Sequence, residues 1–185
     1  MKKTLIAALA ALFAATDVVV ASYTYTVRTD GKVAIVAYAK STSGAVSVPS
    51  TVEGKPVVAL QGAFNGCKKV TSITVPATVT EIGPNTFKNT SKLKSLTFAN
   101  GSPGVYIGND AFSGSKLKTL TIPAKSTVAD YAFYGSKITT LEVSDINPWT
   151  NLANIDDFLS PYNASGTKLM SEIKTLIVPN GSKSN

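Results

Sequence analysis

Residues 63–76 read AFNGCKKVTSITVP, a phenylalanine followed six residues later by an apolar cassette that ends in proline, Val70-x-x-Ile73-x-Val75-Pro76. The phenylalanine recurs at spacings of 23, 25 and 21 residues, as Phe64, Phe87, Phe112 and Phe133. A related cassette follows each copy, beginning at Leu93, Leu117 and Ile138, and a further one begins at Ile173. Self-similarity at this period indicates a solenoid, in which each coil buries its apolar face only against its neighbours.

Each coil is expected to contain two strands. The cassette predicts one strand, and proline ends it because proline has no N–H to donate to a neighbouring strand. An apolar pair before the next phenylalanine, such as Val79 with Ile82, predicts a shorter strand on the opposite side of the coil. The phenylalanine then fills the interior. About six coils with parallel strands about 4.8 Å apart would extend roughly 25 to 30 Å.

The N-terminal residues differ from the repeats. Lys2 and Lys3, an apolar run over residues 5–15 and small residues before Ser22 predict a Sec-type signal peptide over residues 1–21. The run is shorter than the about 20 residues that a membrane span needs, so no stable span is expected. Alternating residues from Tyr23, a turn at Asp30-Gly31 and a second β-rich run predict a hairpin over residues 22–45 that caps the solenoid.

The repeats themselves are expected over residues 46–145, and their period fails after Ile138. The next cassette begins only at Ile173, which places an insertion at residues 146–172 and a last, partial repeat at 173–185. Insertions in solenoids project from one face and often bind partners. Trp149 and Tyr162 lie in this insertion, so we consider them candidate aromatic anchors.

Composition excludes several classes of function. The chain contains no histidine, which removes Ser-His and Cys-His nucleophiles and the commonest metal ligand, so we expect no enzyme, cofactor or metal site. The single cysteine, Cys67, stands where other coils place Thr90, Ser115 and Ser136, which predicts a small buried side chain. The net charge of +7 comes almost entirely from lysine, with one arginine, Arg28, which argues against a nucleic acid partner.

The cassettes also predict an outward-facing surface. Residues between the inward apolar ones form columns of Ser and Thr, including Thr97, Thr119 and Thr121, beside a lysine column of Lys94, Lys118 and Lys174. High β-propensity on a solvated sheet explains the hydroxyls without any function. The functional alternative is a contact surface for a protein or glycan. Glu142 and Ile177 interrupt the hydroxyl columns, which disfavours ice binding.

The repeats resemble the BspA-like leucine-rich repeats of secreted and surface proteins. The resemblance rests on Val79-x-x-Ile82-Gly83-x-x-x-Phe87, on the stretch from Ala63 to Pro76, and on the entry segment from Val48 to Val57, and it covers about residues 23–182. It implies a right-handed, mainly β solenoid with a parallel sheet on one face, association with adhesion, and no catalytic motif. Ala99 and Ser144 depart from the pattern, where proline is expected.

Three hypotheses for function follow. The first is a non-enzymatic protein, secreted or on the cell surface, that binds an extracellular or host-surface protein or glycan in adhesion. The second is a structural or self-assembling module of the cell envelope, and the sequence leaves the oligomeric state open. The third is a glycan-binding module centred on the insertion.

Overall fold

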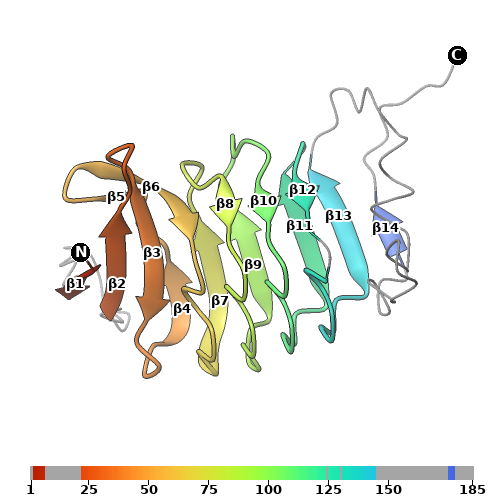
Figure 1. The fold of residues 1–185 in the computed structure, drawn as a ribbon. Helices are drawn as coiled ribbons and strands as arrows, with labels where there is room; N and C mark the ends of the chain where they lie inside the picture. The colour runs from red at the N-terminus through yellow and green to blue at the C-terminus, as the bar shows by residue number, and fades with distance from the viewer. Residues whose placement is uncertain (1, 7–21, 124, 130, 145–174, 178–185) are drawn as a thin grey trace, which may run out of the picture.

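The computed structural model describes residues 2–6, 22–123, 125–129, 131–144 and 175–177. These residues form strands and turns, with no helix among them, and the chain advances coil by coil along one axis (Figure 1). The strands are β1 (Lys2–Ile6), β2 (Ser22–Val27), β3 (Val33–Tyr38), β4 (Ser43–Ser47), β5 (Thr51–Val52), β6 (Lys55–Leu60), β7 (Lys69–Val75), β8 (Glu81–Ile82), β9 (Ser95–Phe98), β10 (Tyr106–Ile107), β11 (Thr119–Pro123), β12 (Thr127–Val128), β13 (Thr140–Ser144) and β14 (Thr175–Ile177).

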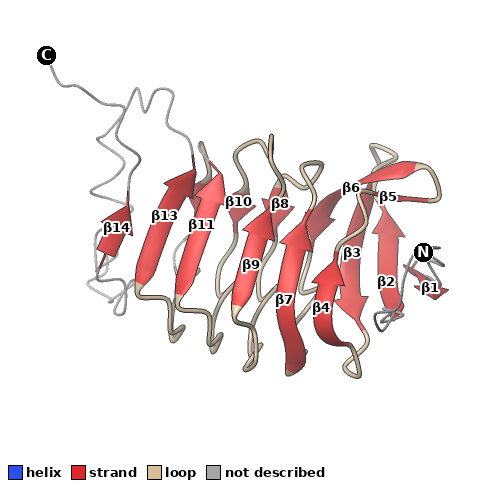
Figure 2. Ribbon diagram, turned by 180° about the vertical axis from the view of Figure 1, so that it is seen from behind, coloured by secondary structure: helices blue, strands red, loops and turns tan. Residues whose placement is uncertain are grey.

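The strands of the coils form two layers on either side of the core. We call β4, β7, β9, β11, β13 and β14 the face strands; Figure 2 shows them side by side and pointing in one direction. The back strands β6, β8, β10 and β12 pair in parallel behind them and join the hairpin strands through β3. The mainly β solenoid with parallel strands that the repeat predicts is therefore confirmed.

The face layer differs in one respect from the expected single sheet. It consists of two three-stranded parallel sheets, β4-β7-β9 and β11-β13-β14, with no ladder between β9 and β11. The interruption follows β9, in the coil from Phe87 to Phe112, which has the longest of the three spacings between phenylalanines. Ala99 follows β9 at the position that proline occupies in the coils of β7 and β11, and its N–H donates to Val75 O at 2.8 Å. Proline has no backbone N–H, so Ala99 can form this hydrogen bond to β7 where proline could not.

The predicted hairpin forms the N-terminal end of the solenoid. β2 and β3 pair antiparallel, and the turn between them places Gly31 at a φ of 77°, a left-handed conformation that glycine adopts without strain. The Asp30 carboxylate accepts a hydrogen bond from Lys32 N at 3.1 Å, which fixes the same turn. β3 then pairs in parallel with β6, so the hairpin continues directly into the back layer.

The edge of the hairpin is covered by β1, which pairs antiparallel with β2 from Lys2↔Thr26 to Ile6↔Ser22. These residues belong to the segment in which we expect a signal peptide. Pairing in the folded chain does not address export, so the signal remains a prediction. Residues 7–21 lie outside the described residues.

A continuous row of aromatic rings fills the core. Tyr38 stacks on Phe64 with ring centroids 4.3 Å apart, and the row continues from Phe64 to Phe87 at 5.7 Å, to Phe112 at 5.0 Å and to Phe133 at 5.6 Å. The first four rings have 2% or less of their surface exposed. The expectation that phenylalanine fills each coil is confirmed, and each ring is held by the coils before and after it.

Small residues three positions after each phenylalanine are buried as predicted. Cys67, Thr90 and Ser115 have no exposed surface, and Ser136 has 1%. Each donates its backbone N–H to the carbonyl of the preceding phenylalanine, which closes the same tight turn in every coil. The position therefore accepts any small side chain, and Cys67 occupies it for packing.

Each of these turns also needs two residues in the left-handed conformation. The first stands two positions before the phenylalanine and the second two positions after it; they are Gly62, Asn85, Asp110 and Tyr131, then Gly66, Asn89, Gly114 and Gly135, with φ between 56° and 70°. Glycine, asparagine and aspartate tolerate this conformation, whereas a bulky tyrosine is strained in it. Tyr131 is thus the exception within the series.

Candidate interaction surface

The face strands present an ordered polar surface because of how each cassette is buried. Its first and fourth residues are both buried although they lie three positions apart, as Val70 and Ile73 show. Strict alternation in a strand cannot produce this spacing. A register shift between β4 and β7 supplies the reason: Gly44 pairs with Val70 and Ala45 with Ser72, which leaves Thr71 as an extra residue. Such a bulge turns two residues outward instead of one.

Lys94 and Lys118 occupy this extra position in the next two coils. Their backbones follow the same path, since Lys94 N donates to Thr71 O at 2.8 Å and Lys118 O accepts from Thr139 N at 2.8 Å. Both lysines are exposed, and Thr71 and Thr139 stand at the two ends of this described column. The bulge therefore determines that these two ammonium groups project from the surface.

Hydroxyl side chains stack in register beside them. The ladders pair Ser72 with Ser95 and Thr74 with Thr97 in one sheet. In the other sheet Thr119 pairs with Thr140, which pairs with Thr175. The columns of Ser and Thr that the repeat predicts are therefore formed by the aligned face strands.

One hydroxyl column ends in a carboxylate. Thr121 Oγ1 donates to Glu142 Oε2 at 2.8 Å across the β11–β13 pair. This hydrogen bond holds the Glu142 side chain against its neighbour and places a negative charge at the end of the surface. The column of threonine hydroxyls therefore ends at Glu142, as the sequence analysis anticipated.

The structure brings together most of the described candidate residues. Lys94, Thr97, Lys118 and Thr119 are exposed and Thr121 is half-buried, all in or next to the adjacent strands β9 and β11. The remaining candidates lie outside the described residues: Lys174, Trp149 and Tyr162.

Several ionisable groups outside this surface are held in structural contacts. Arg28 Nη1 lies 2.9 Å from Glu81 Oε2, and this hydrogen bond and charge raise the pKa of Arg28. The backbone N–H of Lys32 lowers the pKa of Asp30. The Lys88 ammonium lies 3.7 Å from the carboxylate of Asp110, in the turn region. No group of three or more metal-ligating residues occurs among the described residues.

Cys67 is unsuited to nucleophilic chemistry. Its side chain is fully buried, with Sγ 3.9 Å from Tyr38 O, and burial raises the pKa of the thiol. A thiol with a raised pKa is protonated at neutral pH and unreactive.

Two features of this region were missed by the reasoning from sequence. The residue immediately before each cassette is a lysine in four successive coils, namely Lys69, Lys92, Lys116 and Lys137, and all four are exposed. Aligning the copies by their first cassette residue reveals this column directly.

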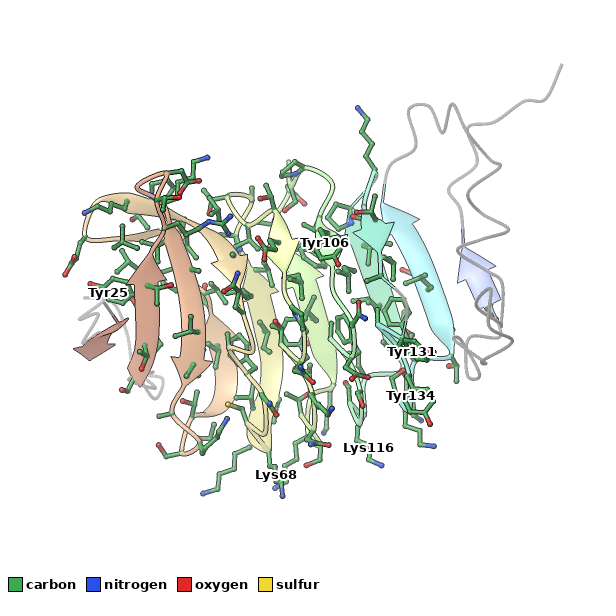
Figure 3. All side chains as sticks on the ribbon, in the orientation of Figure 1. Tyr25, Lys68, Tyr106, Lys116, Tyr131 and Tyr134 are labelled. Atoms are coloured by element: carbon green, nitrogen blue, oxygen red, sulfur yellow. The ribbon has the colours of Figure 1, made fainter. Side chains whose placement is uncertain are left out.

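The second feature is Tyr131, whose ring makes an edge-to-face contact with that of Tyr134 at a centroid distance of 6.1 Å. Figure 3 labels Tyr131 and Tyr134 near each other at the β12–β13 end.

Within the described residues, no helix has the length and apolar character required to cross a membrane.

Comparisons with known proteins agree with this architecture. Residues 59–159 match the family described as BspA type leucine rich repeat region, in six copies. The chain is similar to the crystal structure of a leucine-rich repeat protein from Bacteroides capillosus, with 26% identity and a TM-score of 0.56, over 66% of this chain and 94% of that one. It is also similar in fold to the leucine-rich repeat protein of T. pallidum, with 22% identity and a TM-score of 0.51, over 65% and 68% of the two chains. No curated protein matches the chain.

Proposed function

Because the chain belongs to the BspA type leucine-rich repeat family, we propose that it is a non-enzymatic, exported protein that binds cell-surface or host macromolecules in adhesion. The contact surface is the outer side of the face strands, centred on Lys94, Thr97, Lys118, Thr119 and Thr121. The observation that carries the proposal is that these side chains stand on or next to β9 and β11, which lie side by side in the face layer (Figure 2), and that they are exposed or half-buried.

The physical character of this surface supports binding of a macromolecule. Hydroxyl groups donate and accept hydrogen bonds, and two ammonium groups add a positive charge that attracts acidic partners. The strands that carry these groups are anchored by fully buried residues such as Leu93 and Leu120, so the surface is preorganised. A polar surface spread over several strands suits a macromolecular partner rather than a small molecule.

Export is supported by the sequence of residues 1–21 and by the position of β2. The predicted signal ends before Ser22, and β2 begins at that residue. A cut there therefore removes no residue of the hairpin itself. Expression of the full chain in a bacterial host, followed by mass analysis of the exported product, tests this part. An exported chain that starts near Ser22 supports it, whereas a product retained in the cytoplasm with Met1 or Lys2 at its N-terminus contradicts it.

The binding proposal is tested with the full chain on immobilised extracellular-matrix proteins and on whole host cells. A variant in which Lys94, Lys118 and Lys174 are changed to glutamate should lose binding. A control variant with Lys32, Lys55 and Lys125 changed to glutamate has the same change in charge but leaves the face strands intact, and it should bind normally.

Three results would change the interpretation. Equal losses in both lysine variants would show that net charge, and not this surface, governs binding. Absence of binding together with concentration-dependent oligomers in sedimentation would favour the self-assembling module. Glycan binding that survives the lysine changes but not Trp149→Ala would favour a site in the insertion.

A further inference from the structure

A second charged surface lies along the edge of the solenoid where the face strands begin. We call it the lysine rim; it consists of Lys69, Lys92, Lys116 and Lys137. The face strands all run in one direction, so their first residues gather at one edge (Figure 2). Figure 3 shows Lys68 and Lys116 projecting from this edge, away from the core.

The rim lysines are brought into one row by the register of the strands. Ser72 pairs with Ser95 and Thr119 with Thr140, so the residues three positions earlier, Lys69 with Lys92 and Lys116 with Lys137, occupy matching places. The later turns are one residue shorter than the earlier ones, yet each still ends with lysine before the cassette. Across the break between β9 and β11, Asn89 N donates to Ser113 O at 2.8 Å, so the turns that precede Lys92 and Lys116 are stacked as well. Neighbouring rim lysines therefore follow one another at about 5 Å per coil, the spacing between strands.

The positive charge of the row is not neutralised within the described chain. None of the four rim lysines forms an ion pair with a described residue, whereas Lys32 and Lys88 pair with Asp30 and Asp110. Four like charges held at this spacing repel one another, so a role in stabilising the fold does not explain why all four are lysine. A partner that carries a row of negative charges would relieve this repulsion.

The surroundings of the rim restrict the kind of partner. The residues on either side of each rim lysine are polar or buried, as Ser91 and Leu93 are beside Lys92. The exposed large apolar side chains of the described chain are Val27, Tyr106 and Tyr134, of which only Tyr134 belongs to a coil turn of the rim, so the rim offers a partner charge and almost no apolar contact area. Nucleic acid recognition relies on arginine and on aromatic rings between the charges, and the rim lacks both.

We propose that the lysine rim binds a linear anionic polysaccharide, lying along the solenoid axis with its sulfate or carboxylate groups against successive coils. Lysine suits this partner because its flexible ammonium group recognises charge without a fixed geometry. The rim borders the strand surface described above, since Lys92 and Lys116 each lie two residues before Lys94 and Lys118, but the two surfaces share no residue. Only the choice of a polysaccharide rests on the proposed export, since such polymers are the abundant polyanions outside cells.

The test uses the full chain and heparin as the probe, with uncharged dextran and a single-stranded DNA of similar charge as comparisons. Heparin should bind, dextran should not, and heparin affinity should fall about a hundredfold between 50 and 200 mM salt if about four charges are neutralised. Changing all four rim lysines to glutamine should weaken heparin binding on the order of a hundredfold or more, since each lysine contributes about fivefold near an anionic surface. A control variant with Lys32, Lys55 and Lys125 changed to glutamine should stay within about threefold of the unmodified chain.

Unchanged circular dichroism and thermal midpoint in the rim variant would show that it is folded, as expected for exposed side chains. Equal heparin affinity of the rim variant and the unmodified chain would overturn the proposal, and so would an equal loss in the control variant. Single-stranded DNA binding as tightly as heparin would overturn the choice of polysaccharide. The two proposals fail separately, because the rim variant keeps Lys94 and Lys118 and should still bind a protein partner of the strand surface.

Discussion

Replacing Phe87 by alanine should be among the most destabilising single changes in this chain. The ring is fully buried and lies between Phe64, with centroids 5.7 Å apart, and Phe112, with centroids 5.0 Å apart. Truncation of a buried phenylalanine costs about 3–5 kcal/mol, through lost burial and the cavity that remains. A solenoid coil depends on its two neighbours, so the cavity weakens both interfaces of the coil at once.

Urea unfolding followed by far-ultraviolet circular dichroism measures this change as a shift in midpoint. Phe87→Leu is the matched control: it keeps most of the buried volume and loses the two ring contacts, so its cost should be about 1–2 kcal/mol. Phe98, a partly buried ring packed against the core at the end of β9, should cost less than Phe87 when it is changed to alanine. A loss below about 1.5 kcal/mol for Phe87→Ala, or a loss equal to that of Phe98→Ala, would refute the view that the ring row holds the coils together.

A double-mutant cycle then tests whether the coupling is local. Phe64→Leu and Phe87→Leu alter rings in contact, so their effects should deviate from additivity by about 0.5 kcal/mol or more. Phe64→Leu and Phe133→Leu alter rings separated by two others, and their effects should add. Equal coupling in both pairs would contradict a stack of nearest neighbours.

Three further predictions concern individual residues, and urea midpoints measure each. Tyr38→Phe should stabilise the chain by about 1 kcal/mol, because the buried Tyr38 hydroxyl has no hydrogen-bond partner among the described residues. Burial also raises the pKa of Tyr38 above that of the unfolded chain, so the hydroxyl is neutral in both states below about pH 10. Above that pH the unfolded chain ionises first, so stability should fall as the pH rises further in the unmodified chain but less in the variant. Gly108→Ala should cost about 1–3 kcal/mol, because the new Cβ would lie 2.9 Å from the backbone N of Pro84. Gly135→Ala is the control, since its Cβ meets no neighbour within 4 Å and the substitution incurs only the strain of a φ of 64°. Equal losses of stability in the two variants would contradict a clash at Gly108. Tyr131→Asn should stabilise the chain by about 1 kcal/mol, because asparagine adopts a φ of 60° with less strain than tyrosine. A loss of stability would instead show that the ring contact with Tyr134 outweighs the strain.

The coils and their buried positions were predictable from the sequence because burial repeats with the period. Every described coil needs a ring of the same size and apolar residues at the same places, so Phe112 and Leu120 repeat what Phe64 and Ile73 do. The same rule identified Cys67 as a packing residue. Local chemistry was also sufficient for the hairpin, since Asp30-Gly31 specifies its turn.

The candidate surface was only partly predictable. Outward residues face no packing constraint, so their identity in one coil does not determine the next. The period therefore indicated the lysine column of Lys94 and Lys118 but not that of Lys69 and Lys92. Alternation alone also gives no reason for two outward residues between Val70 and Ile73. The register shift opposite Thr71 supplies that reason.

The repeat, the row of rings and the small buried residues follow from the amino-acid sequence alone, because they depend on contacts between equivalent positions of adjacent coils. Three features required the folded structure: the division of the face layer between β9 and β11, the extra outward residue at Thr71, and the left-handed turn position of Tyr131. These features depend on strand register and backbone conformation, which are set by how whole coils stack. The period of the sequence shows which residues recur, whereas the stacking of the coils determines which of them lie side by side.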